Sequence, residues 1–222
     1  MKSPKKASPE SVFVLCAHSD DQILGVGGTM ARYSHEGKEV TIIVFSYGEK
    51  SHIWLKKRYI ANIRIQESEE AGSVVGAKRV LFFNLEEGKF PEGFARKGIP
   101  QRLKKLFATY QPSKVFTHSP DDVHPDHKAL SKLILEFCDG VKYTGDVYCF
   151  DIWNPLNIAT RDKPKLVVNI TRTFSTKLKA LRVFKSQRWN AISFLIGAVC
   201  WRAVKNGFLH GCRFAEVFYK MR

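Results

Sequence analysis

The chain has 222 residues, a length that fits one domain with a substantial buried core. Its 44% hydrophobic and 26% charged content is typical of a soluble globular protein. The net charge of +15 leaves two interpretations open, a solvated basic surface or an anionic partner such as a nucleotide sugar, a phospholipid headgroup or nucleic acid. Lys and Arg are spread along the chain without a zinc-finger or other nucleic-acid motif, so nucleic acid is the less favoured partner.

The chain ends and the apolar stretches argue against export or membrane insertion. Residues 1–6 are basic, but no apolar run of sufficient length follows, so we expect no signal peptide and a flexible tail over residues 1–10. The longest apolar stretch, residues 191–201, is shorter than the roughly 20 residues of a membrane span and predicts a buried helix. Five cysteines without a CxxC pair indicate reduced thiols in a cytoplasmic protein.

Apolar runs and helical patterns alternate along the chain. Strands are expected at 12–17, 40–45, 80–83, 114–117, 147–152, 166–170 and 214–220. Helices are expected from about residue 30 to residue 35 and at 56–75, 101–110, 125–137, 173–186 and 189–205. Residues 86–100, rich in Gly, Pro and Lys, are expected to form a surface loop near the functional site. This alternation predicts a single α/β domain over residues 1–222, with a Rossmann-like, mostly parallel sheet and helices on both faces.

Glycines follow the first expected strand, at Gly25, Gly27 and Gly28. They lack the G-x-G-x-x-G spacing of a dinucleotide-binding loop, because residue 30 is Met30. We therefore do not expect a nucleotide cofactor.

Two polar clusters come directly after expected strands. The first holds His18, Asp20 and Asp21, and the second, residues 118–127, holds three histidines and three carboxylates. Both follow the carboxyl ends of strands, where α/β sheets bind their ligands, and they meet if the two strands are neighbours. Imidazole and carboxylate ligands suit Zn²⁺ or another divalent transition metal, and three protein ligands leave a position for water.

The motifs in these clusters resemble those of the LmbE-like, or PIG-L, family of zinc-dependent deacetylases. The segment Ala17-His18-Ser19-Asp20-Asp21-Gln22 is similar to the family motif Ala-His-Pro-Asp-Asp-Glu, and the family motif His-Pro-Asp-His is complete at residues 124–127. Further matches extend over nearly the whole chain: Gly27-Gly28-Thr29, Arg64, Glu67, Ala71, Gly76, Lys177, Ala180, Ser186, Gln187 and Arg213-Phe214-Ala215-Glu216.

The resemblance implies a metal site made of His18, Asp21 and His127. His118 is the rival ligand from the residues alone, but its spacing does not match the family motif and it is left out of the set. Asp122 is expected to be a loop or turn residue.

The resemblance also implies the catalytic groups. Asp20 is the general base, and Arg64 contacts the substrate. His124 is the cationic or hydrogen-bonding partner of the developing oxyanion and an acid for the leaving amine, with Asp126 orienting it. A helix N-cap before Pro125 is the alternative role for His124.

Three positions depart from the family pattern. Ser19 replaces a proline, Gln22 replaces an acid, and Phe184 stands where many members have histidine. They leave the implied ligand set intact but affect the substrate that the resemblance suggests.

The implied function is that of a zinc-dependent hydrolase which removes an N-acetyl group from an N-acetylglucosamine-containing substrate, by attack of water activated at the metal. An amidase on another N-acyl or thiol-conjugate substrate is one alternative, and a basic nucleic-acid-binding protein that retains the fold is another. The expected partner is a small acetylated amino sugar, with an anionic one favoured if the charge serves the substrate. A homo-oligomer is implied by the resemblance alone.

Overall fold

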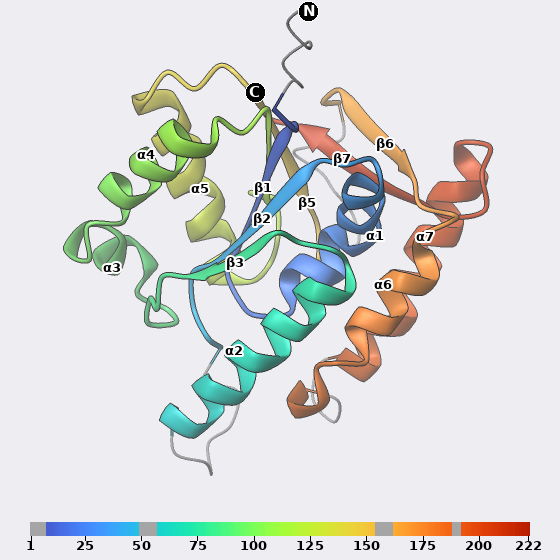
Figure 1. The fold of residues 1–222 in the computed structure, drawn as a ribbon, viewed down its shortest axis with the longest axis horizontal. Coiled ribbons are helices and arrows are strands. Elements are labelled where there is room, and N and C mark those ends of the chain that lie inside the picture. The colour runs from blue at the N-terminus through green and yellow to red at the C-terminus, as the bar shows by residue number, and fades with distance from the viewer. Residues whose placement is uncertain (1–7, 49–56, 154–161, 188–191) are drawn as a thin grey trace, which may run out of the picture.

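Apolar strands and amphipathic helices build a central seven-stranded sheet with helices on both faces (Figure 1). The computed structural model describes residues 8–48, 57–153, 162–187 and 192–222, so most of the expected N-terminal tail lies outside the described residues. The strands are β1 (Ser11–Cys16), β2 (Glu39–Val44), β3 (Arg79–Phe82), β4 (Lys114–His118), β5 (Asp146–Phe150), β6 (Lys165–Asn169) and β7 (Ala215–Lys220). The helices are α1 (Asp21–His35), α2 (Lys57–Val74), α3 (Phe90–Arg96), α4 (Ile99–Tyr110), α5 (Pro125–Gly140), α6 (Phe174–Leu181) and α7 (Ile192–Leu209).

The strand order β3-β2-β1-β4-β5-β7-β6 makes the sheet mostly parallel. The five strands from β3 to β5 run parallel, and β7 is antiparallel to both of its neighbours. The chain therefore forms the single α/β domain that the alternation of strands and helices predicts.

Two apolar cores lie on the two faces of the sheet. In β1, Val12 and Val14 join the core under α1, α2, α6 and α7, whereas Phe13 and Leu15 join the core under α3, α4 and α5. Successive side chains of a strand point to opposite faces, so a strand covered on both faces is apolar throughout. The continuous apolar run of β1 is explained by this double burial.

The expected surface loop near the site, over residues 86–100, is confirmed only for residues 86–89; most of the remaining range is helical. The chain forms α3 there, and α4 begins at Ile99. Pro91 and Pro100 lie in the first turns of these two helices, where a proline removes no helical hydrogen bond. Prolines that suggested an irregular loop are instead helix starts.

The glycines after β1 lie inside α1, which begins earlier than expected. A Cβ atom on Gly25 would lie 2.3 Å from the Phe150 ring, and one on Gly28 would lie 2.6 Å from Ile170. These glycines let α1 approach β5 and the end of β6 closely, so they serve packing.

The prediction of a buried helix at residues 191–201 holds for only one side of α7. Leu195 and Val199 are buried, whereas Trp201 is 68% exposed. No helix in the described part of the chain combines the length and apolar content of a membrane span. All five cysteines are free thiols, and three of them are fully buried.

Pairing of β1 with β4 decides where the two polar clusters lie. The strands are parallel neighbours, with Val12 opposite Lys114 and Val14 opposite Phe116. The chain leaves β1 toward β2 and leaves β4 toward β5, on opposite sides, so a crevice opens at their carboxyl ends. Both clusters lie at that crevice.

Candidate active site

The first cluster forms the turn between β1 and α1. Asp20 is the N-cap residue of α1 and Asp21 is its first residue. The backbone N–H of His18 donates a hydrogen bond of 2.7 Å to Asp21 Oδ2, which fixes this carboxylate relative to the end of β1. Asp20 and Asp21 are both buried, an uncommon state for adjacent carboxylates unless cations or hydrogen-bond donors face them.

The second cluster spans the end of β4 and the first turn of α5. His124 is the N-cap residue, and its Nδ1 accepts a hydrogen bond of 3.2 Å from the backbone N–H of Asp126. Pro125 occupies the first turn, which suits its fixed backbone angle. His127 follows two residues after Pro125 and is buried. His124 therefore caps the helix through Nδ1, and its other ring nitrogen is left for the role that the resemblance implies.

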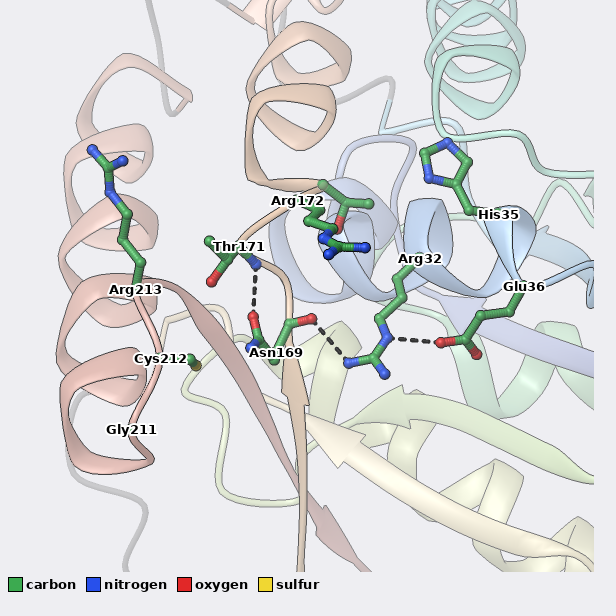
Figure 2. A pocket seen from close by; sticks show the side chains of 10 residues that line it. Arg32, His35, Glu36, Asn169, Thr171, Arg172, Gly211, Cys212 and Arg213 are labelled. Carbon is green, nitrogen blue, oxygen red and sulfur yellow. Dashed lines mark hydrogen bonds and ion pairs between the residues drawn. The ribbon is translucent and has the colours of Figure 1, made fainter.

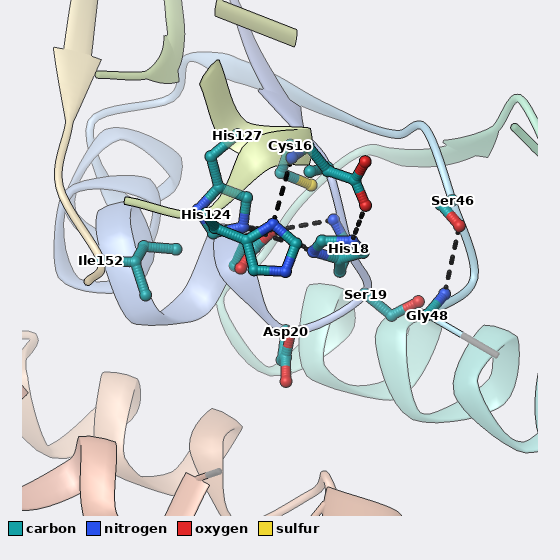
Figure 3. Close-up of polar contacts among 12 residues, drawn as sticks. Cys16, His18, Ser19, Asp20, Ser46, Gly48, His124, His127 and Ile152 are labelled. Carbon is teal, nitrogen blue, oxygen red and sulfur yellow. Dashed lines mark hydrogen bonds and ion pairs between the residues drawn. The ribbon is translucent and has the colours of Figure 1, made fainter. Parts of the chain in front are cut away.

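His18 of the first cluster lies beside His124 and His127 of the second (Figure 3), and three donor atoms of the two clusters form an equilateral triangle. His18 Nδ1, Asp21 Oδ2 and His127 Nε2 are each 3.3 Å from the other two. Ligands about 2.0–2.1 Å from a tetrahedral ion lie about 3.3–3.4 Å from one another, so the triangle matches one face of a zinc-like coordination shell. The donor set fits a divalent transition metal.

Each imidazole of the triangle is held at its remote nitrogen by a carboxylate. Asp126 Oδ2 lies 3.2 Å from His18 Nε2, and Asp122 Oδ1 lies 3.2 Å from His127 Nδ1. Such a carboxylate keeps the proton on the remote nitrogen and leaves the other nitrogen's lone pair for a metal. Two expectations are corrected here: Asp126 hydrogen-bonds His18 rather than orienting His124 through its carboxylate, and Asp122 is more than a loop residue.

These carboxylates are themselves anchored by backbone donors. Asp126 Oδ1 accepts from the N–H of Gly88 at 2.8 Å, and Asp122 Oδ2 accepts from the N–H groups of Ile152 and Trp153 at 3.2 and 3.3 Å. The loops after β3 and β5 thus fix the positions of Asp126 and Asp122, the two carboxylates that contact the imidazoles.

His118 is close to the triangle and, with Asp122 and His127, forms a second group of possible ligand atoms. Its Nε2 accepts a hydrogen bond of 2.9 Å from the backbone N–H of Ala17, which occupies the lone pair. Burial and the neighbouring His127 lower the pKa of His118 to about 4, so the ring is neutral. The ligand set without His118 stays a prediction, which the Ala17 N–H at His118 Nε2 favours.

The two adjacent aspartates have opposite electrostatic environments. Burial raises the pKa of Asp20, although the guanidinium of Arg64, 3.8 Å away, opposes the shift. Burial also disfavours the charged form of Asp21, but the imidazoles of His127 and His118 hold its pKa well below the usual value. Asp21 is therefore an ionised oxygen donor, and Asp20 is the more basic of the pair.

His124 stacks on His127 and meets His18 edge to face. Its ring centroid is 4.6 Å from that of His127 and 5.0 Å from that of His18. Burial and these neighbours lower its pKa below the usual value. Because Nδ1 accepts an N–H, the neutral ring carries its proton on Nε2, which makes His124 a hydrogen-bond donor in the pocket that it lines.

The pocket over the triangle has a volume of about 300 Å³. Its lining residues are His18, Asp20, Asp21, Leu24, Arg64, Glu87, His124, His127, Trp153, Gln187 and Leu195. Arg64 is 2% exposed and comes from α2, as the sequence motif implies. The sequence did not indicate Glu87, Trp153 or Leu195, because single residues of these types in a loop or helix carry no motif.

Gln22 and Phe184, two of the departures from the family pattern, both fit their surroundings in the structure. The side-chain amide of Gln22 donates to the Ser19 carbonyl at 2.7 Å and to the Ser68 hydroxyl at 2.9 Å. An acid at position 22 has no N–H for the Ser19 carbonyl, so Gln22 is matched to this network. Phe184 is 1% exposed and belongs to the apolar core rather than to the pocket lining.

The remaining matched residues hold the helices around the site. Lys177 Nζ donates to Glu216 Oε1 at 2.6 Å and to the Leu24 carbonyl at 2.8 Å, which ties α6 and β7 to α1. Glu67 accepts from the backbone N–H and hydroxyl of Ser186 at 2.8 and 2.5 Å, which ties α2 to the turn after α6. These matches are structural and lie outside the chemistry of the site.

Comparison with known proteins gives relatives of two kinds. A deacetylase of 1D-myo-inositol 2-acetamido-2-deoxy-alpha-D-glucopyranoside from Saccharomonospora viridis is 30% identical over 156 residues, which are 57% of this chain and 58% of that relative. The 4-oxalmesaconate hydratase of Pseudomonas putida is 27% identical over 206 residues, covering 84% of this chain and 76% of the hydratase. The chain thus spans little more than half of the first relative.

Similarity in structure extends over the whole domain. The N,N'-diacetylchitobiose deacetylase of Pyrococcus horikoshii superposes with a TM-score of 0.79 and 26% identity, covering 96% of this chain and 84% of that one. The sequence profile of the PIG-L family, described as GlcNAc-PI de-N-acetylase, matches residues 13–138, a range that contains both polar clusters. The chain therefore belongs to the PIG-L family.

Proposed function

We propose that the protein is a divalent-metal-dependent deacetylase of an N-acetylglucosamine-containing substrate. The observation that carries the proposal is the triangle of His18 Nδ1, Asp21 Oδ2 and His127 Nε2, with edges of 3.3 Å, at a pocket that Asp20 and His124 also line. The names of the S. viridis and P. horikoshii relatives support the class of substrate.

A metal held by the three donor atoms supplies Lewis-acid activation of water and of the amide carbonyl. Asp20, which burial makes more basic than Asp21, accepts the proton of the attacking water. Arg64, 3.8 Å from Asp20, keeps this carboxylate in place and lies in the pocket wall, where it contacts the substrate. Zn²⁺ is the proposed metal, because two imidazoles and one carboxylate form one of its common catalytic ligand sets.

His124 donates its Nε2–H to the carbonyl oxygen as negative charge develops there. Its Nδ1 is fixed by the Asp126 backbone N–H, so the donor is oriented before the substrate binds. The pocket of about 300 Å³ is at the small end of ligand sites, which suits one sugar unit with its acetyl group.

Hydration of a double bond is the second candidate, because the P. putida relative is named as a hydratase and is matched over more of this chain than the S. viridis deacetylase. A carboxylated substrate needs cationic side chains around it. Besides the proposed metal and its imidazoles, the described pocket lining offers Arg64 as a cationic side chain, together with the carboxylates Asp20, Asp21 and Glu87. The charge of the pocket therefore favours a neutral amide substrate.

Measured product release distinguishes the two reactions. Purified protein loaded with Zn²⁺ is incubated with N-acetylglucosamine, its inositol conjugate and diacetylchitobiose, and released acetate is quantified. A parallel assay follows loss of the absorbance of 4-oxalmesaconate. Acetate release without hydration supports the proposal, and hydration without acetate release overturns it.

The Asp20→Asn variant is the matched control for that assay. It keeps the shape of the side chain and the three donor atoms, so it should keep the metal and lose acetate release by about 10²–10⁴-fold. Asp21→Asn should instead lose metal. Equal metal loss in both variants would contradict the separate roles of these two carboxylates.

A further inference from the structure

The outward side of α7 is apolar, although it lies on the surface. Seven large apolar side chains are exposed in the described part of the chain, and four of them lie within nine residues of α7. These four form what we call the α7 face: Trp201 (68% exposed), Val204 (43%), Phe208 (85%) and Leu209 (62%). Exposed aromatic and aliphatic side chains gathered on one helix face indicate an interaction surface.

The charge of the chain is concentrated in the same region. Residues 163–215 contain eleven Lys or Arg residues and no Asp or Glu, so this segment contributes +11 of the net charge of +15. It includes α6 and α7, which both pack with α1 on one side of the sheet (Figure 1). Such asymmetry indicates an anionic partner for this side of the molecule.

A cationic cavity of about 700 Å³ adjoins the α7 face (Figure 2). It lies between the end of α1, the start of α6 and the loop after α7, and Arg32, Arg172 and Arg213 line it. We call it the arginine pocket. The Arg32 guanidinium already donates hydrogen bonds to the Glu36 carboxylate at 2.8 Å and to the Asn169 carbonyl at 3.0 Å.

The other two arginines are open to an anion. Arg172 and Arg213 are exposed, and within the described residues neither forms an ion pair with a carboxylate. The pocket includes Gly211, two residues after Leu209 in the chain, so it lies near the end of α7 where Phe208 and Leu209 are exposed.

We propose that the α7 face and the arginine pocket together dock on an anionic phospholipid surface. Tryptophan and phenylalanine on one side of a surface helix, next to Lys and Arg, is the pattern of helices that lie in the headgroup region of a membrane. The four apolar side chains enter the boundary of the acyl chains, and the arginines hold lipid phosphates. This inference is independent of the metal site.

Two other occupants fit the observations less well. A second copy paired through the same helix brings the exposed Lys205 residues and the arginine pockets of both chains together, and like charges oppose that contact. Nucleic acid would satisfy the arginines, but its phosphate backbone offers no apolar partner for Phe208 or Val204. An anionic membrane offers phosphates for the arginines and an apolar boundary for the side chains of the α7 face.

Docking on lipid leaves the catalytic pocket open. Leu195 lines that pocket from the buried side of α7, whereas the exposed rings begin at Trp201, about 9 Å further along the helix. The lipid-facing side chains and the pocket-facing side chain therefore use different sides of one helix.

Co-sedimentation of the full chain with vesicles tests the proposal. Vesicles of phosphatidylcholine alone are compared with vesicles that contain about 30% phosphatidylglycerol, at about 100 mM and about 500 mM NaCl. We expect binding to the anionic vesicles at low salt, at least about tenfold weaker binding at high salt, and little binding to the neutral vesicles.

Substitutions in the α7 face and in the arginine pocket test the apolar and the cationic contribution to vesicle binding separately. Phe208→Ser should weaken binding to anionic vesicles by about tenfold, since one exposed ring no longer enters the lipid. Tyr59→Ser, which removes a ring that is 59% exposed on α2, is its control and should leave binding unchanged. Circular dichroism checks that both variants fold.

The cationic part has its own matched pair. Arg172→Ala with Arg213→Ala should weaken binding as strongly as high salt does, whereas Lys104→Ala with Lys105→Ala, on exposed α4, should not. Equal binding to neutral and anionic vesicles, or none to either, would overturn the proposal. So would a dimer in light scattering that Phe208→Ser dissociates, or salt-sensitive RNA binding that Phe208→Ser leaves unchanged.

Discussion

Asp122 and Asp126 set the direction of the two imidazoles of the proposed metal site. Each carboxylate holds the nitrogen remote from the triangle, so each imidazole presents its lone pair to the ion. The carboxylates also make the rings more basic: against the effect of burial, contacts with Asp126 and Asp21 raise the pKa of His18 to about 10. A proton and a metal compete for these lone pairs, so metal affinity should fall as the pH falls.

Replacing Asp122 by Asn should lower the affinity for Zn²⁺ by about 10–100-fold. Asn keeps the shape of the side chain and can still accept from the Ile152 and Trp153 N–H groups, but it lacks the charge that polarises His127. Competition with a fluorescent chelator measures the affinity. Asp139→Asn, at the exposed end of α5, is the control. An unchanged affinity in the Asp122 variant would show that the carboxylate serves only the loop.

His124 should affect turnover rather than metal binding. His124→Ala should keep the metal and lower kcat and kcat/KM together by about 10²–10³-fold, because its N–H acts on charge that develops in the transition state. His124→Gln restores an N–H donor and should recover part of kcat. Metal analysis of both variants accompanies the kinetics. An alanine variant that has lost its metal would place His124 among the ligands instead.

The contacts of Asp126 and Asp122 show where reasoning from sequence fails at the scale of residues. The motif placed Asp126 beside His124, two residues before it in the chain, but the Asp126 carboxylate reaches His18, 108 residues away. That contact depends on the pairing of β1 with β4, which no local pattern specifies. The triangle itself could be predicted, because both of its segments carry dense, recognisable motifs.

At the scale of elements, a buried ion pair joins α6, β7 and α1. Glu216 accepts from Lys177 at 2.6 Å, from the N–H groups of Gly28 and Thr29 at 3.0 and 2.7 Å, and from the Thr29 hydroxyl at 2.6 Å. Both charges are nearly inaccessible to water. A buried pair with all its hydrogen bonds made contributes little by itself, but removal of one partner leaves an uncompensated charge.

Replacing Glu216 by Gln should therefore lower the free energy of unfolding by about 3–5 kcal/mol. Urea denaturation measures this change, and the slope should stay the same because the exposed surface does not change. Lys220→Met removes a pair with Asp146 that is 40% and 36% exposed, and should cost no more than about 1 kcal/mol. Similar losses of unfolding free energy in both variants would show that burial of the Lys177–Glu216 pair does not determine the cost of breaking it.

Elements with a clear hydrophobic period were predictable, and those set by packing were not. The strands β1 and β2 are mostly apolar and buried along almost their whole length, because both of their faces are covered. Helix α3 was missed because Pro91 and Gly93 in its seven residues resemble a loop locally. Its stability comes from Phe90 and Phe94, which are buried in the core under α4 and α5. Tertiary contacts of this kind outweigh local propensity.

At the scale of the molecule, the two proposed binding regions lie at opposite ends of α1. Asp21 begins this helix at the triangle, and Arg32 lines the arginine pocket near its other end. The helix rises about 17 Å between these residues, about twice the Debye length of about 8 Å at physiological salt. The excess of Lys and Arg in residues 163–215 can be counted from the sequence. Only the fold shows that α6 and α7 of this segment lie on one side of the sheet.

The two regions should therefore be separable. Arg172→Ala with Arg213→Ala should leave kcat/KM for a water-soluble acetylated amino sugar within about twofold of the original value at 150 mM salt, since screening over this distance leaves little of the potential. The same protein should lose its binding to anionic vesicles. Asp20→Asn should show the reverse, with full vesicle binding and no turnover. A large loss of kcat/KM in the arginine variant would mean that α1 couples its two ends, or that the substrate itself carries an anionic group that reaches the arginine pocket.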